Sequence, residues 1–155
     1  MPIGDDTHAT RRHLPHLQKA ERNYYVTFCT HHRRRLSEAE RSTVLQTAID
    51  LHRMFCWLHV ITVMPDHVHA ILQPLGLSFS GVMKRLKGRS SLNANRAMGR
   101  SGRLWQAEFF DRILRSDENL TEKMDYICNN PVRAGIVAAW REYRWTWRAC
   151  DHVTD

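Results

Sequence analysis

The stretch CWLHVITVMPDHVHAILQ, residues 56–73, decides the fold. Its two halves, residues 56–64 and 67–73, are rich in the β-branched and apolar residues that favour strands. Pro65 and Asp66 separate the halves, and both residue types are typical of tight turns. We therefore expect a β-hairpin whose two strands pair in an antiparallel sheet.

Two elements are expected upstream of this hairpin. Residues 23–29 (NYYVTFC) are dense in aromatic and β-branched residues and favour a strand. The pattern Ser37-x-x-Glu40 forms a capping box, which is typical of a helix start. The helix that follows has an apolar stripe at helical spacing, made of Val44, Leu45, Ala48 and Ile49.

Three elements are expected downstream. A second helix begins near Ser78 and is ended by Gly99 and Gly102, and residues 108–114 (EFFDRIL) favour a strand. Ser116 is expected to cap a third helix, which ends before Pro131 because proline disfavours a helical residue before it. The resulting order is strand, helix, strand, strand, helix, strand, helix. This order predicts an α+β fold with a mostly antiparallel, ferredoxin-like sheet and helices packed on it.

Charge indicates the kind of partner. The chain has 155 residues and is 43% hydrophobic and 25% charged, which is typical of one globular domain. Its formal net charge of +7 is typical of a protein with a polyanionic partner. Residues 81–103 hold seven basic residues and no acid, so this block alone equals the net charge. Four of its basic side chains fall largely outside the apolar stripe of the second helix and are expected to bind nucleic acid: Lys84, Arg85, Lys87 and Arg89.

Other features exclude classes of protein. The apolar runs are shorter than the roughly 20 residues of a membrane span, and the first 20 residues are too polar for a secretory signal. The four cysteines form no C-x-x-C pair, so we expect reduced thiols in a cytoplasmic protein without membrane contact. A zinc site at Cys150 and His152 is disfavoured because no second ligand pair stands at the required spacing.

Two short motifs could carry chemistry. His67 and His69 are two apart on an expected strand, so both imidazoles point from one face about 7 Å apart and could share a divalent metal ion. The alternative is two polar residues on an exposed strand face. Tyr126 and Asn130, in MDYICNNPVRAG, are four apart on the expected third helix and share a face. The alternative there is a partly buried tyrosine and an asparagine near a helix end.

Together these motifs and the spacing between them resemble the single-tyrosine, His–hydrophobic–His (HUH) transposases of the IS200-like family. The likeness is to the REP-associated tyrosine transposase branch and covers roughly residues 10–147. Arg11 and Arg12 lie in a segment similar to the basic N-terminal segment of this branch. We therefore expect a basic arm over residues 1–22 and the HUH endonuclease domain over residues 23–150.

The resemblance implies a reaction and its residues. His67, His69 and Asn130 would bind Mg²⁺ or Mn²⁺, and Tyr126 would attack the phosphorus of single-stranded DNA to give a 5′-phosphotyrosyl intermediate. The partner would be hairpin DNA of repetitive extragenic palindromes, contacted also by Arg11 and Arg12. A monomer is favoured, and a dimer is the alternative. The alternative function is a catalytically silent module that binds hairpin DNA or RNA.

Several residues have two interpretations when judged from the sequence alone. Asp66 departs from the Asn or Glu common in the family, and a turn role is favoured over one beside the metal. Core packing is favoured over base stacking for the aromatic residues of the tail 140–147. For Trp105, core packing is at least as well supported as base stacking. Glu108 and Asp111 are not expected to be metal ligands.

Overall fold

The computed structural model describes residues 7–9 and 22–149. The strands are β1 (Thr7–Ala9), β2 (Tyr24–Cys29), β3 (Cys56–Val63), β4 (His67–Pro74), β5 (Phe110–Ile113) and β6 (Thr146–Arg148). The helices are α1 (Glu38–Leu51), α2 (Phe79–Met98), α3 (Leu120–Cys128) and α4 (Asn130–Arg133), with short 3-10 turns at His31–Arg33 and Trp140–Glu142. The predicted order of elements is confirmed from β2 to α3. Most of the expected arm, including Arg11 and Arg12, lies outside the described residues.

The strands form one antiparallel sheet in the order β1-β5-β2-β4-β3-β6. Its four central strands have the arrangement of a ferredoxin-like fold, as predicted. β1 and β6 extend the sheet at its two edges, and neither was expected from the sequence. No helix among the described residues combines the length and apolar character needed to cross a bilayer.

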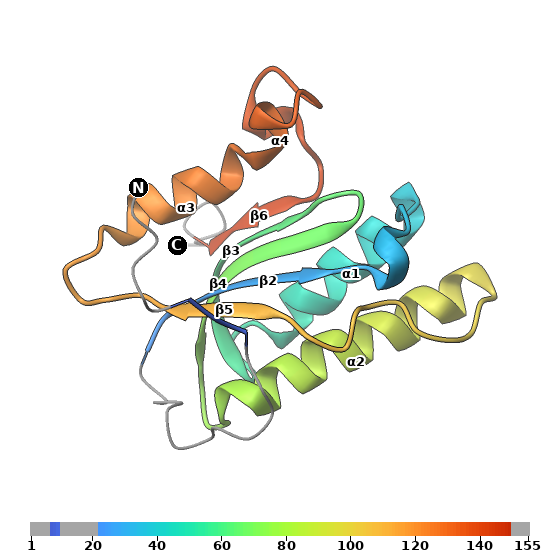
Figure 1. Cartoon of the computed structure of the whole chain (residues 1–155), viewed down its shortest axis with the longest axis horizontal. Helices are drawn as coiled ribbons and strands as arrows, with labels where there is room; N and C mark the ends of the chain where they lie inside the picture. Colours follow the sequence, from blue (N-terminus) through green and yellow to red (C-terminus); the bar gives the residue numbers. More distant parts are fainter. Residues whose placement is uncertain (1–6, 10–21, 150–155) are drawn as a thin grey trace.

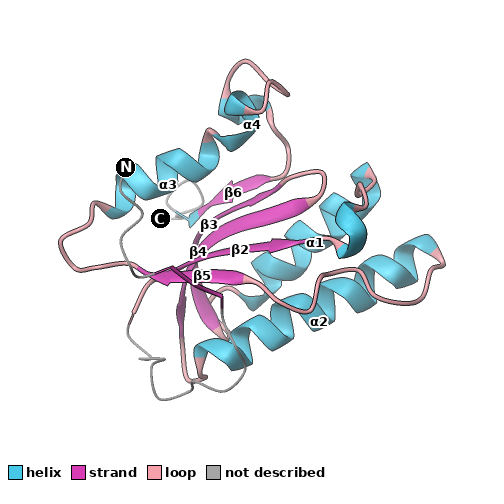
Figure 2. Ribbon diagram, in the orientation of Figure 1, coloured by secondary structure: helices cyan, strands magenta, loops and turns pink. Residues whose placement is uncertain are grey.

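The two faces of the sheet carry different helices (Figures 1 and 2). Along β4, Val68, Ala70 and Leu72 point to the face covered by α1 and α2, where the main hydrophobic core lies. The alternate residues of β4 point to the other face, where Ile71 packs in a smaller core against α3. Because side chains alternate along a strand, His67 and His69 share this second face with α3.

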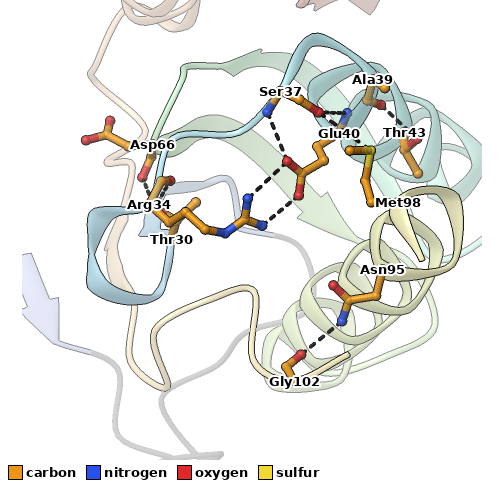
Figure 3. Close-up of polar contacts among 10 residues, drawn as sticks. All are labelled: Thr30, Arg34, Ser37, Ala39, Glu40, Thr43, Asp66, Asn95, Met98 and Gly102. Carbon is orange, nitrogen blue, oxygen red and sulfur yellow. Dashed lines mark hydrogen bonds and ion pairs between the residues drawn. The ribbon is translucent and has the colours of Figure 1, made fainter. Parts of the chain in front are cut away.

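The start of α1 is held as its sequence predicts (Figure 3). Ser37 Oγ accepts a hydrogen bond from the Glu40 backbone N–H at 3.1 Å, and Glu40 Oε1 accepts one from the Ser37 N–H at 3.0 Å. Arg34 adds two hydrogen bonds to the same carboxylate, at 3.1 and 2.6 Å. This pair therefore ties the loop before α1 to the helix itself.

The prediction that Ser116 caps the third helix is wrong. α3 begins at Leu120, and its cap is Asn119, whose Oδ1 accepts from the Glu122 N–H at 3.0 Å. The cause is Glu118, whose carboxylate accepts hydrogen bonds from Arg112 and from the Arg115 backbone. These contacts keep residues 115–118 in a turn rather than a helix.

The prediction that Tyr126 and Asn130 share one helix is also wrong. α3 ends at Cys128, before Pro131 as expected, and Asn130 starts the separate short helix α4. Pro131 has no N–H to continue the helical bond to the Ile127 carbonyl. The hydroxyl of Thr62 on β3 donates to that carbonyl instead, at 3.3 Å.

The aromatic tail packs on the core, as predicted. Tyr143, Trp145 and Trp147 are buried, and the Tyr143 hydroxyl donates to the Val63 carbonyl at 2.6 Å. Trp105 is buried as well, and its indole N–H donates to Ser90 Oγ at 2.9 Å. Core packing is therefore the role the structure gives all four rings.

Candidate active site

β4 presents its two histidines between β2 and β3, on the face that α3 covers. The rings of His67 and His69 lie edge to face, with centroids 4.8 Å apart. This confirms that the two imidazoles are neighbours on one face.

Each imidazole is oriented through Nδ1. His67 Nδ1 donates to Asp66 Oδ1 at 2.7 Å, and His69 Nδ1 shares a hydrogen bond with Thr27 Oγ1 at 2.8 Å. A proton on Nδ1 leaves the lone pair on Nε2, which is the form that binds metal ions. Burial, followed by the charges of His67 and Arg133, lowers the pKa of His69 to about 3, so its ring is neutral at physiological pH.

Asp66 lies in the turn of the hairpin, as expected, and its carboxylate also orients His67. Arg33 binds the other carboxylate oxygen through Nε and a terminal nitrogen, both at 3.0 Å. Burial opposes ionisation, but the hydrogen bonds from His67 and Arg33 outweigh it and lower the pKa of Asp66. Arg33 reaches this position from left-handed backbone, with φ of 56° at His32 and 55° at Arg33.

Tyr126 lies on α3 between residues that anchor the helix. Ile127 and Cys128 are buried against the sheet, whereas Tyr126 is 57% exposed. Arg148 of β6 forms an ion pair with Asp125, which adds a second tie near the same end of α3. The phenol is therefore accessible while the helix that carries it is fixed.

Asn130 begins α4, and its side chain is half-buried. Its Oδ1 accepts a hydrogen bond from an Arg133 terminal nitrogen at 3.2 Å. Its Nδ2 is buried and has no hydrogen-bond partner among the described residues. An orphaned amide nitrogen at this position indicates that a further polar group belongs here.

Tyr25 lies beside His69 and Arg133 lies beside Tyr126, and neither residue was expected at the site from the sequence. The Tyr25 ring lies 6.2 Å from the His69 ring. Burial, with a smaller contribution from Tyr126, raises the pKa of Tyr25 to about 12, against the opposing charges of Arg133 and Arg112. Tyr25 shares a face with Thr27 by strand alternation, and Arg133 is one helical turn after Asn130, so both signals were present in the sequence.

The chemistry of the predicted ligands is suited to a divalent metal ion. Two imidazoles oriented through Nδ1 and one amide oxygen from Asn130 suit Mg²⁺ or Mn²⁺ when water or phosphate oxygens complete the shell. No group of three His, Cys, Asp or Glu residues that could hold a metal occurs within residues 7–9 and 22–149, so His67 and His69 would need a ligand of another type, such as the predicted Asn130 amide. Asp111 pairs with Val26 in the sheet and shares its face with α1 and α2, away from the histidines.

The basic residues expected to contact nucleic acid lie on different sides of α2. Lys84 is exposed, whereas Lys87 donates to the carbonyls of Gln106 and Ala107 at 2.7 and 3.2 Å. The guanidinium groups of Arg85 and Arg89 lie over the Phe55 ring, at 4.6 and 5.2 Å. Lys84 and Lys87 line a groove of about 930 Å³ between α2 and residues 103–109.

Comparison with known proteins identifies the family. The model of the family described as "Transposase IS200 like" matches residues 18–130, well over half of the chain. The protein therefore belongs to the IS200-like transposase family, which confirms the resemblance drawn from its motifs.

Two individual proteins are similar to this chain, one in sequence and one in fold. A Haemophilus influenzae protein described as "Putative REP-associated tyrosine transposase" is 28% identical over 96 residues, 54% of this chain and 53% of that protein. The chain thus spans about half the length of this curated relative. A solved structure of a REP-associated tyrosine transposase bound to a REP hairpin superimposes with a TM-score of 0.69 at 22% identity, covering 90% of this chain and 81% of that one. This likeness confirms the predicted fold.

Proposed function

We propose that the protein is a metal-dependent single-strand DNA endonuclease and strand transferase that acts at hairpin DNA through Tyr126. One observation carries the proposal: an accessible phenol stands on a firmly anchored helix that packs on the sheet face carrying the two oriented imidazoles. The Tyr25 ring lies 6.2 Å from the His69 ring, and burial with a smaller contribution from Tyr126 raises the pKa of Tyr25, which supports a single site.

The reaction assigns a role to each residue. Tyr126 Oη attacks phosphorus, the bond between phosphorus and the 3′ oxygen breaks, and the 5′ end stays on the tyrosine. The phenol proton passes to solvent, and the departing 3′ oxygen takes a proton from solvent. His67, His69 and Asn130 would hold Mg²⁺ or Mn²⁺, which when bound polarises the phosphate oxygens. Return of the 3′ hydroxyl to the phosphotyrosine rejoins strands without a nucleotide cofactor.

The proposed DNA partner follows from charge and from the relatives. The basic block over residues 81–103 lies mostly on α2, on the sheet face opposite the histidines, so it would contact phosphates of the hairpin away from the cleaved bond, and binding should weaken with salt. The solved relative is bound to a REP hairpin, which makes a hairpin the substrate to test first. Arg11 and Arg12 remain proposed contacts in the N-terminal segment. Because one chain supplies both histidines and the tyrosine, we propose that a monomer is sufficient.

The test is a denaturing-gel assay with hairpin DNA labelled at either end, in the presence of Mn²⁺. The wild-type protein should form a covalent adduct with the 5′-phosphate fragment. Tyr126→Phe should form none while it binds the hairpin with nearly unchanged affinity, since only the nucleophilic oxygen is lost. Tight binding by the wild type without an adduct, across several hairpins and metals, would instead favour the silent binding module.

A further inference from the structure

Arg133 holds an unusual position beside the proposed nucleophile. Its guanidinium carbon lies 3.7 Å from the centroid of the Tyr126 ring. One terminal nitrogen donates to Asn130 Oδ1 at 3.2 Å. A single cation thus contacts both the tyrosine and the proposed amide ligand.

The backbone that carries Arg133 is held by hydrogen bonds at the start of α4. The Arg133 N–H donates to the Asn129 carbonyl, and the Ala134 N–H donates to the Asn130 carbonyl, both at 3.0 Å. Buried Pro131 fixes the first turn of α4. The guanidinium therefore projects from a short, braced helix rather than from a loose loop.

The charge of Arg133 is available for a ligand. The residue is exposed, and no carboxylate among the described residues forms an ion pair with it. A guanidinium has five N–H donors, and the bond to Asn130 uses one of them. Planar guanidinium groups match the oxygen geometry of phosphates. An uncompensated cation beside an accessible phenol is thus suited to an anion at the tyrosine.

We propose that Arg133 is a further catalytic residue, which donates hydrogen bonds to the scissile phosphate while Tyr126 attacks it. The inference rests on the proposed function. The bond from Tyr126 Oη to phosphorus forms as the bond to the 3′ oxygen breaks, and the phosphoryl oxygens gain negative charge in between. Arg133 stays protonated throughout and stabilises that charge, which is the form of catalysis that contributes most in many enzymes.

The first experiment measures the rate of adduct formation under single-turnover conditions at saturating hairpin DNA. Arg133→Ala should lower this rate about 100-fold, the effect of removing one donor that stabilises transition-state charge. Arg133→Lys should recover part of the loss, because it restores charge without the planar fork. The matched control is Arg144→Ala, which removes an exposed guanidinium 5.4 Å from Trp145, on the opposite face of the sheet.

The second experiment separates charge stabilisation from mere positioning of Tyr126. The scissile phosphate is replaced by a methylphosphonate, in both stereoisomers, which removes its negative charge. If Arg133 neutralises that charge, the ratio of wild-type to Arg133→Ala rates should fall toward one on this substrate. An equally large ratio on both substrates would overturn the proposal and leave Arg133 a structural support.

The remaining outcomes distinguish this inference from the proposed function. If wild type forms the adduct and Arg133→Ala forms it equally fast on the normal phosphate, the inference is wrong and the endonuclease stands. If wild type forms no adduct while it binds the hairpin, both proposals are wrong. Hairpin affinity should change little in Arg133→Ala, because one contact among many phosphate contacts is removed.

Discussion

The buried Glu40 carboxylate should make the stability of this protein depend on pH. Its side chain is 1% exposed and accepts hydrogen bonds from Arg34 and from the Ser37 backbone. Burial alone would raise the pKa of Glu40, but these partners outweigh it and lower the pKa from 4.5 to about 2. A shift of this size corresponds to about 3 kcal/mol of folding free energy, at 1.36 kcal/mol per pKa unit.

The sign follows from which state binds the proton. Between pH 4.5 and 2, the unfolded chain binds a proton at Glu40 and the folded chain does not, so stability rises with pH across this window. The contribution of Glu40 is complete above pH 4.5 and is lost as pH falls toward 2. Glu40→Gln removes the charge at every pH and should cost about 3 kcal/mol at pH 7.

Urea denaturation of wild type and Glu40→Gln from pH 7 downward measures this difference. The gap between the two proteins should be widest at neutral pH and should narrow below pH 4.5. Glu38→Gln is the control, because it removes an exposed carboxylate from the same helical turn. A gap that stays constant from pH 7 to the acid limit of the folded state would refute the linkage to this carboxylate.

Two further predictions concern the site. Thr27→Val removes the hydrogen-bond partner of His69 Nδ1 and should weaken Mn²⁺ binding by the DNA-free protein about 10- to 100-fold. Calorimetric titration measures this affinity, and an unchanged affinity would contradict the prediction. Thr62→Val removes the donor to the Ile127 carbonyl and should cost about 1–3 kcal/mol in urea denaturation, with slower adduct formation as α3 loosens. A fully stable Thr62→Val protein would show that α3 does not depend on this bond.

Local features of the fold were predictable because each depends on residues close in sequence. The capping box at Ser37 and Glu40 involves neighbours along one turn, and the hairpin needs only its turn residues and two apolar runs. The shared face of His67 and His69 follows from strand alternation alone.

The two wrong helix predictions depend on side-chain contacts that the helix pattern does not show. α3 starts later than expected because Glu118 is bound by Arg112 of β5, six residues earlier, and a capping pattern does not include this contact. Tyr126 and Asn130 lie on separate helices partly because of Thr62, which is more than sixty positions away in sequence. Its hydroxyl donates a hydrogen bond to the Ile127 carbonyl. Arg133 was not predicted to belong to the site, because its position over the Tyr126 ring depends on how α4 follows α3.

The left-handed backbone at His32 and Arg33 has a thermodynamic consequence. For residues with a Cβ this conformation costs on the order of 1 kcal/mol each, and glycine would adopt it without that penalty. Glycine at position 33 would, however, abolish the contact that braces Asp66 behind His67. A substitution in this loop that raises thermal stability would therefore disturb the orientation of the His67 imidazole. The loop is thus a place where stability and activity oppose each other.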